Sequence, residues 1–358
     1  MSSSGFMYLN SGQSEKWLEL IQQTGNYDFY HLPFYHLLSR SLNEGEPVLF
    51  QYQEDSYLIC LPLLLRPIDA VQGLEECGRG YKDATSVYGY AGPLCSSRNI
   101  PGDVVLRFQE SLKAELERLC VVSLFSRLHP IAANISLIQN LGTCRLEGHT
   151  VSIDTSLPLD IQYNSFRRNH RKDIERLRSV GMVCREGSSI SEIQAFVEIY
   201  DESMKRIGAT ENYYFPEWWY EGFLGSAEAT NRLFLCYLDD EPICGGLVAM
   251  CNGLVQMHLA ATRTEWMARS PLKLLFDHVR LWAAEQHASV LHLGGGVGAK
   301  ADSLYRFKSG FSKTRHCFHT WRWIIDEPVY DMLARAKGKS IENQDLSPGD
   351  GFFPRYRA

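Results

Sequence analysis

The feature of this sequence that most constrains its fold is an order of secondary-structure elements that occurs twice. In each half, the spacing of apolar residues predicts two helices, a group of strands, a helix, a strand, a further helix and a closing strand. The expected elements of the first half lie at 15–23, 33–43, 46–52, 57–66, 101–119, 121–128, 131–141 and 144–153. Those of the second half lie at 160–179, 190–207, 232–238, 242–251, 254–262, 271–282, 289–296, 301–309 and 316–325.

This order is that of the GNAT-type N-acyltransferase fold, so its repetition predicts a tandem. The expected fold class is α/β, with α+β mixed sheets, in two GNAT-like domains packed around a shared cleft. We expect an N-terminal domain at 1–155, a C-terminal domain at 156–338 and a loose C-terminal tail at 339–358. The short connection near 155, DTSLPLD, contains no long linker and predicts close packing of the two domains.

Two local signals support the element assignments of the second half. Ser189 and Glu192 form a capping box in front of the helix expected at 190–207. Asn252-Gly253 is a strong signal for a two-residue turn between antiparallel strands.

Composition narrows the possible environments and partners. The formal charge of −6 argues against a protein that is basic throughout, so a polyanion must meet a local basic patch. Ten cysteines are present without a CxxC pair or zinc-like spacing, which favours reduced thiols and no metal site. The N-terminus lacks the pattern of a secretory signal, and the most apolar stretch, YLICLPLLL (57–65), is too short to cross a bilayer. We therefore expect a cytoplasmic protein with no integral membrane segment.

The glycine run in LHLGGGVGAK (291–300) raises the question of a phosphate-binding loop. GGGVGA formally fits the dinucleotide pattern G-x-G-x-x-G/A, but no carboxylate follows at the distance that this pattern requires. The Walker pattern also fails, because Ala299 precedes Lys300 and Ala301 follows it. The glycines are equally consistent with tight backbone packing at the end of a strand.

The combination of LGGG and DSLYRFKSGF (302–311) resembles the FemAB-like aminoacyltransferases and related acyltransferases built from two GNAT-type domains. The resemblance extends to DATSVYGYAGPL, FSRLHP, FRRNHRKDIERLRSVG and YDESMKRIGATENYYF, and covers most of residues 30–325. Members of that family use aminoacyl-tRNA to add amino acids to peptidoglycan precursors, and related branches use other activated acyl donors. The family motif L-x-x-F-K-x-x-F matches Leu304, Phe307, Lys308 and Phe311.

The resemblance implies roles for several side chains. It places Lys308 at the acyl-transfer centre with Phe307 beside it, and assigns acceptor contacts to Arg206 and to Tyr213 or Tyr214. The alternative for Lys308 is a solvent-exposed lysine on a helix.

Other candidates for the site come from residue type and position. Asp302 is a candidate base, with a helix N-cap as its alternative role. His258 and His292 lie on neighbouring strands where GNAT folds splay apart to admit the donor, and either could relay protons or be a core histidine. Further candidates for substrate contact are Tyr90, Gly92, Gly295, Gly296 and Tyr305.

Donor phosphates require a cationic surface. The expected basic helix at 160–179 supplies Arg167, Arg168, Arg171 and Lys172, which could hold the phosphates of tRNA, coenzyme A or a nucleotide-linked acceptor; its alternative is a solvated helix face. Arg269 is a further candidate in RTEWMARSPL (263–272), a loop that lacks the glycines by which acetyl-CoA transferases bind pyrophosphate.

Together these features predict an N-acyltransferase of the FemAB-like type. The expected reaction is attack by an amine on an ester or thioester carbonyl, for which Lys308 would stabilise the oxyanion or the leaving group. The expected donor is aminoacyl-tRNA or acyl-CoA, with no tightly bound cofactor and no metal. The expected acceptor is a small or nucleotide-linked amine of a cell-envelope precursor, an amino sugar or a related metabolite. The alternatives are an acyl-CoA-dependent GNAT enzyme, which would need the backbone amides of 267–272 for pyrophosphate, and a non-catalytic RNA- or phospho-ligand-binding module.

Overall fold

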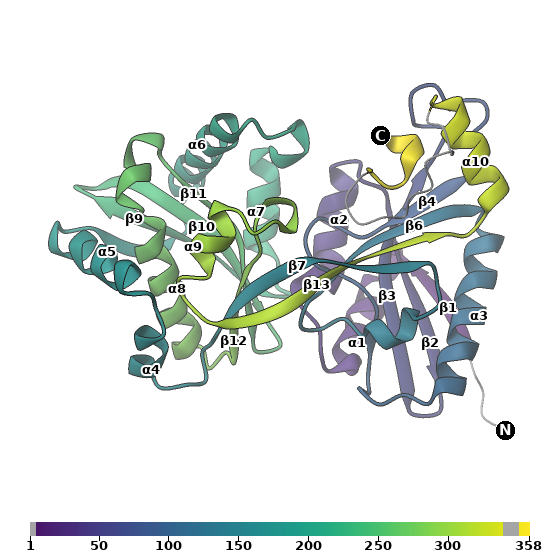
Figure 1. The fold of residues 1–358 in the computed structure, drawn as a ribbon, viewed down its shortest axis with the longest axis horizontal. Helices are drawn as coiled ribbons and strands as arrows, with labels where there is room; N and C mark the ends of the chain where they lie inside the picture. The colour runs from purple at the N-terminus through teal and green to yellow at the C-terminus, as the bar shows by residue number, and fades with distance from the viewer. Residues whose placement is uncertain (1–4, 339–350) are drawn as a thin grey trace. The chain divides into compact units, whose positions relative to one another are not determined.

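A computed structural model describes residues 5–338 and 351–358 of the chain (Figure 1). The chain divides into two compact units, here called unit 1 (1–147 and 318–358) and unit 2 (148–317). Each unit has its own series of paired strands and its own hydrophobic core.

Unit 1 contains a sheet in the order β1-β2-β3-β4-β6-β13. Only β4 and β6 are parallel to each other among these neighbours. The strands are β1 (Gly5–Asn10), β2 (Glu46–Glu54), β3 (Tyr57–Pro67), β4 (Lys82–Thr85), β6 (Val121–Leu128) and β13 (Thr314–Ile324), with β5 (Leu94–Cys95) paired to β3. The helices are α1 (Ser14–Thr24), α2 (Pro33–Ser41), α3 (Gly102–Arg118) and α10 (Glu327–Ala336), with single turns η1 (Ser11–Gln13), η2 (Phe29–His31), η3 (Ile135–Ile138) and η7 (Arg355–Arg357).

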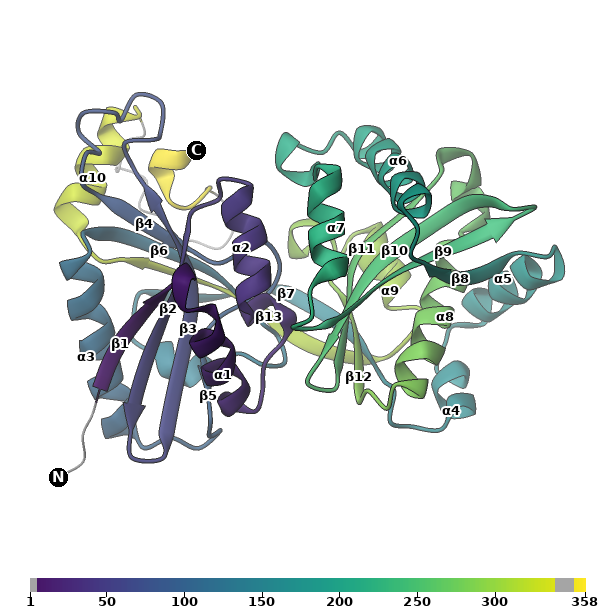
Figure 2. The same ribbon diagram turned by 180° about the vertical axis from the view of Figure 1, so that it is seen from behind.

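In unit 1, successive side chains of a strand point to opposite faces of the sheet, and those on one face form the core. Phe50, Leu61 and Leu63 point to the face that is covered by α3, where Phe108 and Leu112 join the same core. Figure 2 shows α1 and α2 on the opposite face of the sheet.

Unit 2 repeats this arrangement, with strand order β8-β9-β10-β11-β12-β7. Again one pair of neighbours, β11 and β12, is parallel. The strands are β7 (Thr143–Asp154), β8 (Val183–Gly187), β9 (Thr230–Leu238), β10 (Glu241–Cys251), β11 (Leu254–Thr262) and β12 (Val290–Gly294). The helices are α4 (Leu159–Asn164), α5 (Arg168–Ser179), α6 (Ile190–Ile207), α7 (Glu217–Gly225), α8 (Leu272–Glu285) and α9 (Ser303–Lys308), with single turns η4 (Glu211–Tyr213), η5 (Thr264–Arg269) and η6 (Val297–Ala299).

Two adjacent glycines of β10 lie where helices pack on the two opposite faces of the strands of unit 2. A Cβ atom on Gly245 would meet Phe196 of α6 at 2.8 Å, whereas one on Gly246 would meet Leu275 of α8 at 3.2 Å. Helices α6 and α8 therefore cover opposite faces, and both pack closely because these positions carry no side chain.

The local signals noted above are confirmed. Helix α6 begins after a capping box made by Ser189 and Glu192, and it ends at Gly208 in the left-handed conformation. Asn252-Gly253 joins β10 to β11, with Cys251 opposite Leu254.

The expected division of the chain is different from the observed one. The sequence predicts domains at 1–155 and 156–338, but the units meet at 147/148 and again at 317/318. The reason is an exchange of strands: β13, from the second half of the sequence, pairs with β6, and β7, from the first half, pairs with β12. Hence α10 and the end of β13 belong to unit 1.

Three further expectations need correction. The basic helix expected at 160–179 is broken at 165–167 into α4 and α5. The thiols of Cys184 and Cys236 are not free, because these residues face each other on β8 and β9 and form a disulfide. Within the expected tail, 339–350 lie outside the described residues, but Tyr356 is fully buried and its hydroxyl lies 2.7 Å from Ser123 Oγ. The last residues are therefore part of the core of unit 1.

No helix among the described residues is long and apolar enough to cross a membrane.

Candidate active site

The candidate site begins where the two parallel strands of unit 2 stop pairing. Residues 254–256 of β11 pair with 290–292 of β12, and β11 then continues to Thr262 along β10. Among the described residues, none of β11 beyond Gln256 pairs with β12. The ends of these two strands therefore separate, as the GNAT-type order of elements predicts.

The glycine run turns the chain sharply at the end of β12. Gly294 has a φ of 76°, in the left-handed region that favours glycine. A Cβ atom on Gly296 would lie 2.1 Å from Lys300 O and 2.4 Å from Asp302 Oδ1. The run allows the segment before α9 to fold back on itself, which explains these glycines without a phosphate ligand.

Asp302 is the N-cap of α9. Its Oδ1 accepts a hydrogen bond from Tyr305 N at 2.8 Å, and its Oδ2 accepts one from Val297 N at 3.0 Å. The carboxylate thus joins the glycine turn to the helix, which agrees with the N-cap alternative and leaves its role as a base a prediction.

Lys308 is the last residue of α9 and turns back toward the glycine run. Its Nζ donates a hydrogen bond to Gly295 O at 2.9 Å. Burial of the ammonium group lowers the pKa of Lys308 to about 8, and the nearby Asp302 carboxylate acts in the opposite direction. The side chain is only half-buried along its length, so the desolvation concerns its charged end. This is not the environment of an ordinary exposed helix lysine.

Aromatic rings surround α9. Phe307 lies edge-on to Phe276 and to Phe311, with ring centroids 5.3 Å apart in both cases. Tyr305 is half-buried, and the guanidinium of Arg315 lies 5.7 Å from its ring centroid. Phe307 therefore contributes to the apolar packing that fixes α9 in unit 2.

The first turn of α5 lies against the C-terminal end of α9. Arg167 N donates to Gly310 O at 2.7 Å, and Arg167 Nη1 donates to Arg306 O at 3.2 Å. Arg171 Nη1 donates to Asn164 O at 3.1 Å, while Arg168 and Lys172 are exposed. Of the four predicted phosphate-binding cations, Arg167 donates hydrogen bonds to the segment around Lys308. The phosphate role of all four stays a prediction.

The predicted acceptor residues Arg206, Tyr213 and Tyr214 come from the end of α6 and from η4. Arg206 donates hydrogen bonds to Thr262 O at 3.3 Å and to Thr264 Oγ1 at 2.8 Å, so its guanidinium holds the end of β11. Tyr213 is exposed and Tyr214 is half-buried. Acceptor binding by these three residues stays a prediction.

The two candidate histidines have different surroundings. His292 is fully buried, with Nδ1 2.6 Å from Gln256 Oε1 and Nε2 2.8 Å from Thr150 Oγ1. His258 stacks on Phe223, and burial lowers its pKa to about 3. Both arrangements agree with the core-histidine alternative, and the partners Gln256 and Thr150 carry no signal in the sequence that singles them out.

Arg269 lies at the end of η5 with its guanidinium over the ring of Trp266, 4.5 Å from the centroid. In the same segment, Ser270 N donates to Met267 O, so this amide is already bonded within the loop. The pyrophosphate of an acyl-CoA bound at 267–272 would therefore have to accept hydrogen bonds from backbone amides other than that of Ser270.

Tyr90 and Gly92 belong to unit 1. The ring of Tyr90 lies edge-on to Phe318 at 5.3 Å and to Tyr30 at 5.9 Å. Gly92 has a φ of 108°, and a Cβ atom there would meet the side chain of Leu128 at 2.9 Å. Both residues pack within their own unit, which agrees with a turn that is shaped by packing.

Unit 1 also holds a buried pair that the sequence analysis missed. His129 Nε2 lies 3.0 Å from Asp28 Oδ2, and both side chains are fully buried. The two residues are 101 positions apart, so no local pattern could have joined them.

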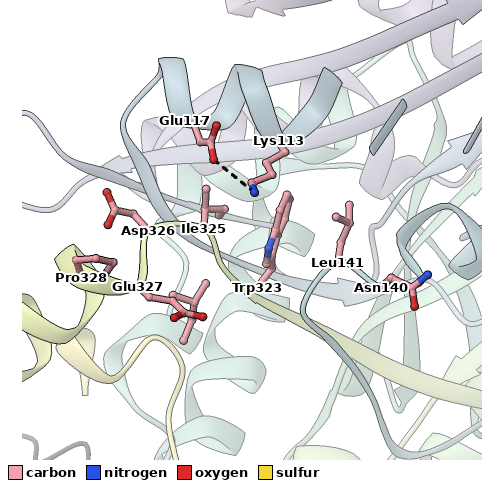
Figure 3. Close-up of a pocket in the computed structure, with 10 residues that line it drawn as sticks. Lys113, Glu117, Asn140, Leu141, Trp323, Ile325, Asp326, Glu327 and Pro328 are labelled. Atoms are coloured by element: carbon pink, nitrogen blue, oxygen red, sulfur yellow. Dashed lines mark ion pairs between the residues drawn. The ribbon is translucent and has the colours of Figure 1, made fainter. Parts of the chain in front are cut away.

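A cavity of about 600 Å³ also lies in unit 1, between α3, the end of β13 and the start of α10 (Figure 3). Trp323 forms part of its lining, with Lys113 and Glu117 on one side and Asp326 on another. None of the predicted site residues lines this cavity. Among the described residues, no group of three His, Cys, Asp or Glu side chains could hold a metal ion.

Comparisons with known proteins agree with this geometry. Residues 164–309 match the family model of an acetyltransferase (GNAT) domain, which contains the glycine run and Lys308. The structure of FemX is similar with a TM-score of 0.64 and 12% identity, covering 92% of this chain and 99% of that one. L-PGS from Bacillus licheniformis has a TM-score of 0.55 and 13% identity, covering 88% and 93% of the two chains.

A third similar structure is the C-terminal domain of a protein from Agrobacterium fabrum that is named as a lysylphosphatidylglycerol synthetase. It has a TM-score of 0.53 and 12% identity, covering 87% of this chain and 91% of that one. No curated protein sequence matches the chain. The chain therefore has a tandem GNAT fold that includes an acetyltransferase (GNAT) domain at residues 164–309. The resemblance to the FemAB-like group is confirmed at the level of the fold.

Proposed function

We propose that this protein transfers an aminoacyl or acyl group from an activated donor to an amine, and that Lys308 is the cation at the reacting carbonyl. The observation that carries the proposal is the ammonium of Lys308, which is desolvated at the end of β12 and directed at Gly295 O. It lies within the matched GNAT domain, beside the place where β11 and β12 separate.

The reaction needs little beyond positioning and charge. The amine attacks the donor carbonyl, a C–N bond forms, and the C–O or C–S bond to the carrier breaks, while the proton lost by the amine ends on the oxygen or sulfur of the carrier. Negative charge gathers first on the carbonyl oxygen and then on the leaving oxygen or sulfur. A partly desolvated ammonium stabilises both more strongly than it would in water, and no reorganisation is needed at the moment of reaction.

Two resemblances of this chain point to two different activated donors. FemAB-like proteins use aminoacyl-tRNA, and GNAT domains commonly use acyl-CoA. We favour aminoacyl-tRNA because the exposed Arg168 and Lys172 lie on the helix whose first turn contacts the Lys308 segment, and because the fold extends over 99% of FemX. The name of the Agrobacterium fabrum relative and the fold of FemX favour an acceptor of the cell envelope.

The first experiment measures turnover with Lys308→Ala. The purified protein is incubated with charged tRNA or acyl-CoA and a panel of amines, and release of the carrier is followed. We expect Lys308→Ala to reduce turnover by about 10²–10³-fold, which is the usual effect of losing one group that stabilises an oxyanion. Lys313→Ala is the matched control, because Lys313 is exposed and lies outside the site. Full turnover by Lys308→Ala would refute the role of Lys308.

A second experiment identifies the donor. Binding of charged tRNA and of acyl-CoA is measured at two salt concentrations, because contacts to a polyanion weaken with salt. Saturable and salt-dependent binding of tRNA supports the aminoacyl donor. Tight binding of acyl-CoA with no binding of tRNA would establish a coenzyme A enzyme instead.

A further inference from the structure

The helix that carries Lys308 is very short, and its position depends on groups outside it. Helix α9 has six residues, from Ser303 to Lys308. The last carbonyl groups of a helix have no partner within the helix, and helices of this length are not stable alone. Asp302 fixes the N-terminal end. At the C-terminal end, Ser309 N donates to Tyr305 O and Gly310 N donates to Phe307 O, and donors from other elements add to these bonds.

Residues at the break between α4 and α5 supply those donors. Arg167 donates to two carbonyls of this segment, Arg306 O and Gly310 O. His170 Nε2 lies 2.9 Å from Phe307 O, on the peptide group that immediately precedes Lys308. Ser165 Oγ lies 3.0 Å from Phe311 O. The donors thus reach four carbonyl groups on both sides of Lys308.

The imidazole of His170 also determines the shape of this segment. His170 is 6% exposed, and its ring lies 4.7 Å from that of Phe311 and 5.7 Å from that of Phe307. A Cβ atom on Gly310 would lie 2.1 Å from His170 Nε2. The imidazole therefore packs directly on the backbone of Gly310, and no other residue type fits at 310 while His170 is in place.

The hydrogen bond defines the protonation of this ring. Phe307 O can only accept, so His170 Nε2 carries the proton. Burial lowers the pKa of His170, which favours the neutral ring, and Nδ1 has no hydrogen-bond partner among the described residues. His170 is therefore a neutral donor held between two aromatic rings and a glycine.

We propose that His170 is a positioning residue for Lys308: through its hydrogen bond to Phe307 O and its packing on Gly310, it holds the C-terminal end of α9 where the Lys308 ammonium reaches Gly295 O. This inference rests on the proposed function for its consequence in catalysis. It also links the basic helix α5 to the transfer centre, because the donor that holds α9 is in the first turn of α5.

The test is a double-mutant cycle on His170 and Gly310. His170→Ala removes the donor, and Gly310→Ala pushes the imidazole away while leaving it present. We expect each single variant to reduce kcat by about 10–100-fold with a smaller effect on the KM of the donor, because a misplacement of about 1 Å has an effect of this size. In the double variant, the missing imidazole leaves space for the Cβ atom. We therefore expect Gly310→Ala to cause little further loss in the His170→Ala background.

Two controls separate positioning from loss of folding. His170→Gln retains a side-chain N–H donor and should recover most of the activity that His170→Ala loses. Asn169→Ala changes an exposed neighbour in the same turn and should behave like the wild type. Additive effects of His170→Ala and Gly310→Ala, or no recovery with Gln, would overturn the proposal.

A readout without substrate distinguishes this inference from the proposed function. Modification of Lys308 by an amine-reactive reagent, mapped by mass spectrometry at pH 8, reports on the environment of its amino group. We expect His170→Ala to change the modification rate of Lys308 by about three- to tenfold, and Asn169→Ala to leave it unchanged. An unchanged rate in His170→Ala would refute the positioning role even if Lys308 is catalytic. A changed rate together with full turnover by Lys308→Ala would support the positioning role and refute the proposed function.

Discussion

The two units share a common order of elements, in which a first strand is followed by two helices, three strands, a helix and a strand, but they differ at the ends of their parallel strands. In unit 1, the chain after β4 returns to β6: Ser86 N donates to Phe125 O and Ala91 N donates to Arg127 O. In unit 2, β11 and β12 have no such connection beyond Gln256 in the described part of the chain. The first strand end is closed by main-chain hydrogen bonds, and the second is not.

The side chains that follow these strands also differ in how completely they are hydrogen-bonded. After β6, His129 is bonded at both nitrogens, because Nε2 meets Asp28 and Nδ1 accepts from Ile131 N and Ala132 N. After β12, the Lys308 ammonium is desolvated and meets one backbone carbonyl. The strand end of unit 1 is thus followed by a fully hydrogen-bonded buried pair, and that of unit 2 by a desolvated lysine. We expect substitutions near this point in unit 1 to lower mainly the free energy of unfolding, and those in unit 2 to lower mainly the rate of turnover.

The largest expected effect is on the stability of unit 1. Asp28→Ala removes the carboxylate from a fully buried pair and should lower the free energy of unfolding by about 3–5 kcal/mol. Denaturant unfolding measures this change. The control is Asp103→Ala, whose exposed ion pair with Arg107 is screened by solvent, so its loss should change the free energy of unfolding little. A loss below 1 kcal/mol for Asp28→Ala would contradict the assignment of this pair as structural.

The next effect concerns the glycine turn of unit 2. Gly296→Ala introduces a Cβ atom 2.1 Å from Lys300 O and should cost about 1–3 kcal/mol, together with most of the activity, because Asp302 must move. Gly225→Ala is the control, since a Cβ atom there meets nothing within 4 Å. If Gly296→Ala is fully active, the turn does not position α9.

A substitution of Lys308 itself should increase the free energy of unfolding, by less than the decreases expected above. Its pKa of about 8 is below the ordinary value for lysine, so the folded state disfavours the charged form. The destabilisation is complete below pH 8 and disappears as the pH rises toward about 10.4, the unfolded value. Lys308→Met should therefore raise the free energy of unfolding by about 1 kcal/mol at pH 7, because solvent partly screens the half-buried side chain, and the gain should vanish near pH 10. Urea unfolding at both pH values measures this, and a loss of stability at pH 7 would exclude a desolvated ammonium.

The smallest effect concerns the basic helix. If Arg168 contacts one phosphate of tRNA, Arg168→Ala should reduce the slope of log affinity against log salt by about 0.7–0.9. Binding titrations at several salt concentrations measure the slope. Arg118→Ala in unit 1 serves as the control, because Arg118 is paired with Glu115 and outside the proposed site. Equal slopes for the two variants would remove Arg168 from the donor surface.

Sequence patterns predicted the parts of this fold that depend on near neighbours. The capping box of Ser189 and Glu192 defines the start of α6 because its hydrogen bonds span three residues. The close backbone packing at the glycine run and the N-cap at Asp302, which was the alternative to its role as a base, depend on residue types in one short segment. The position of Lys308 came from the family resemblance, and its partner Gly295 O lies only 13 residues away.

Other features depend on residues that are distant in the sequence, and no local pattern contains them. The pairing of β13 with β6 joins residues almost 200 positions apart, and the contact of His170 with Phe307 O spans 137. The disulfide between Cys184 and Cys236 depends on the register of two strands, which is set by packing on both faces of the sheet.

By itself, then, the sequence determined the order of elements, their caps and turns, and the presence of a lysine after a glycine run, because these depend on interactions over a few residues. Only the tertiary structure decided which strands the two units exchange, which carbonyls hold α9, and that the end of Lys308 is desolvated. Those outcomes depend on the burial of groups brought together from distant parts of the chain, and burial is a property of the packed molecule.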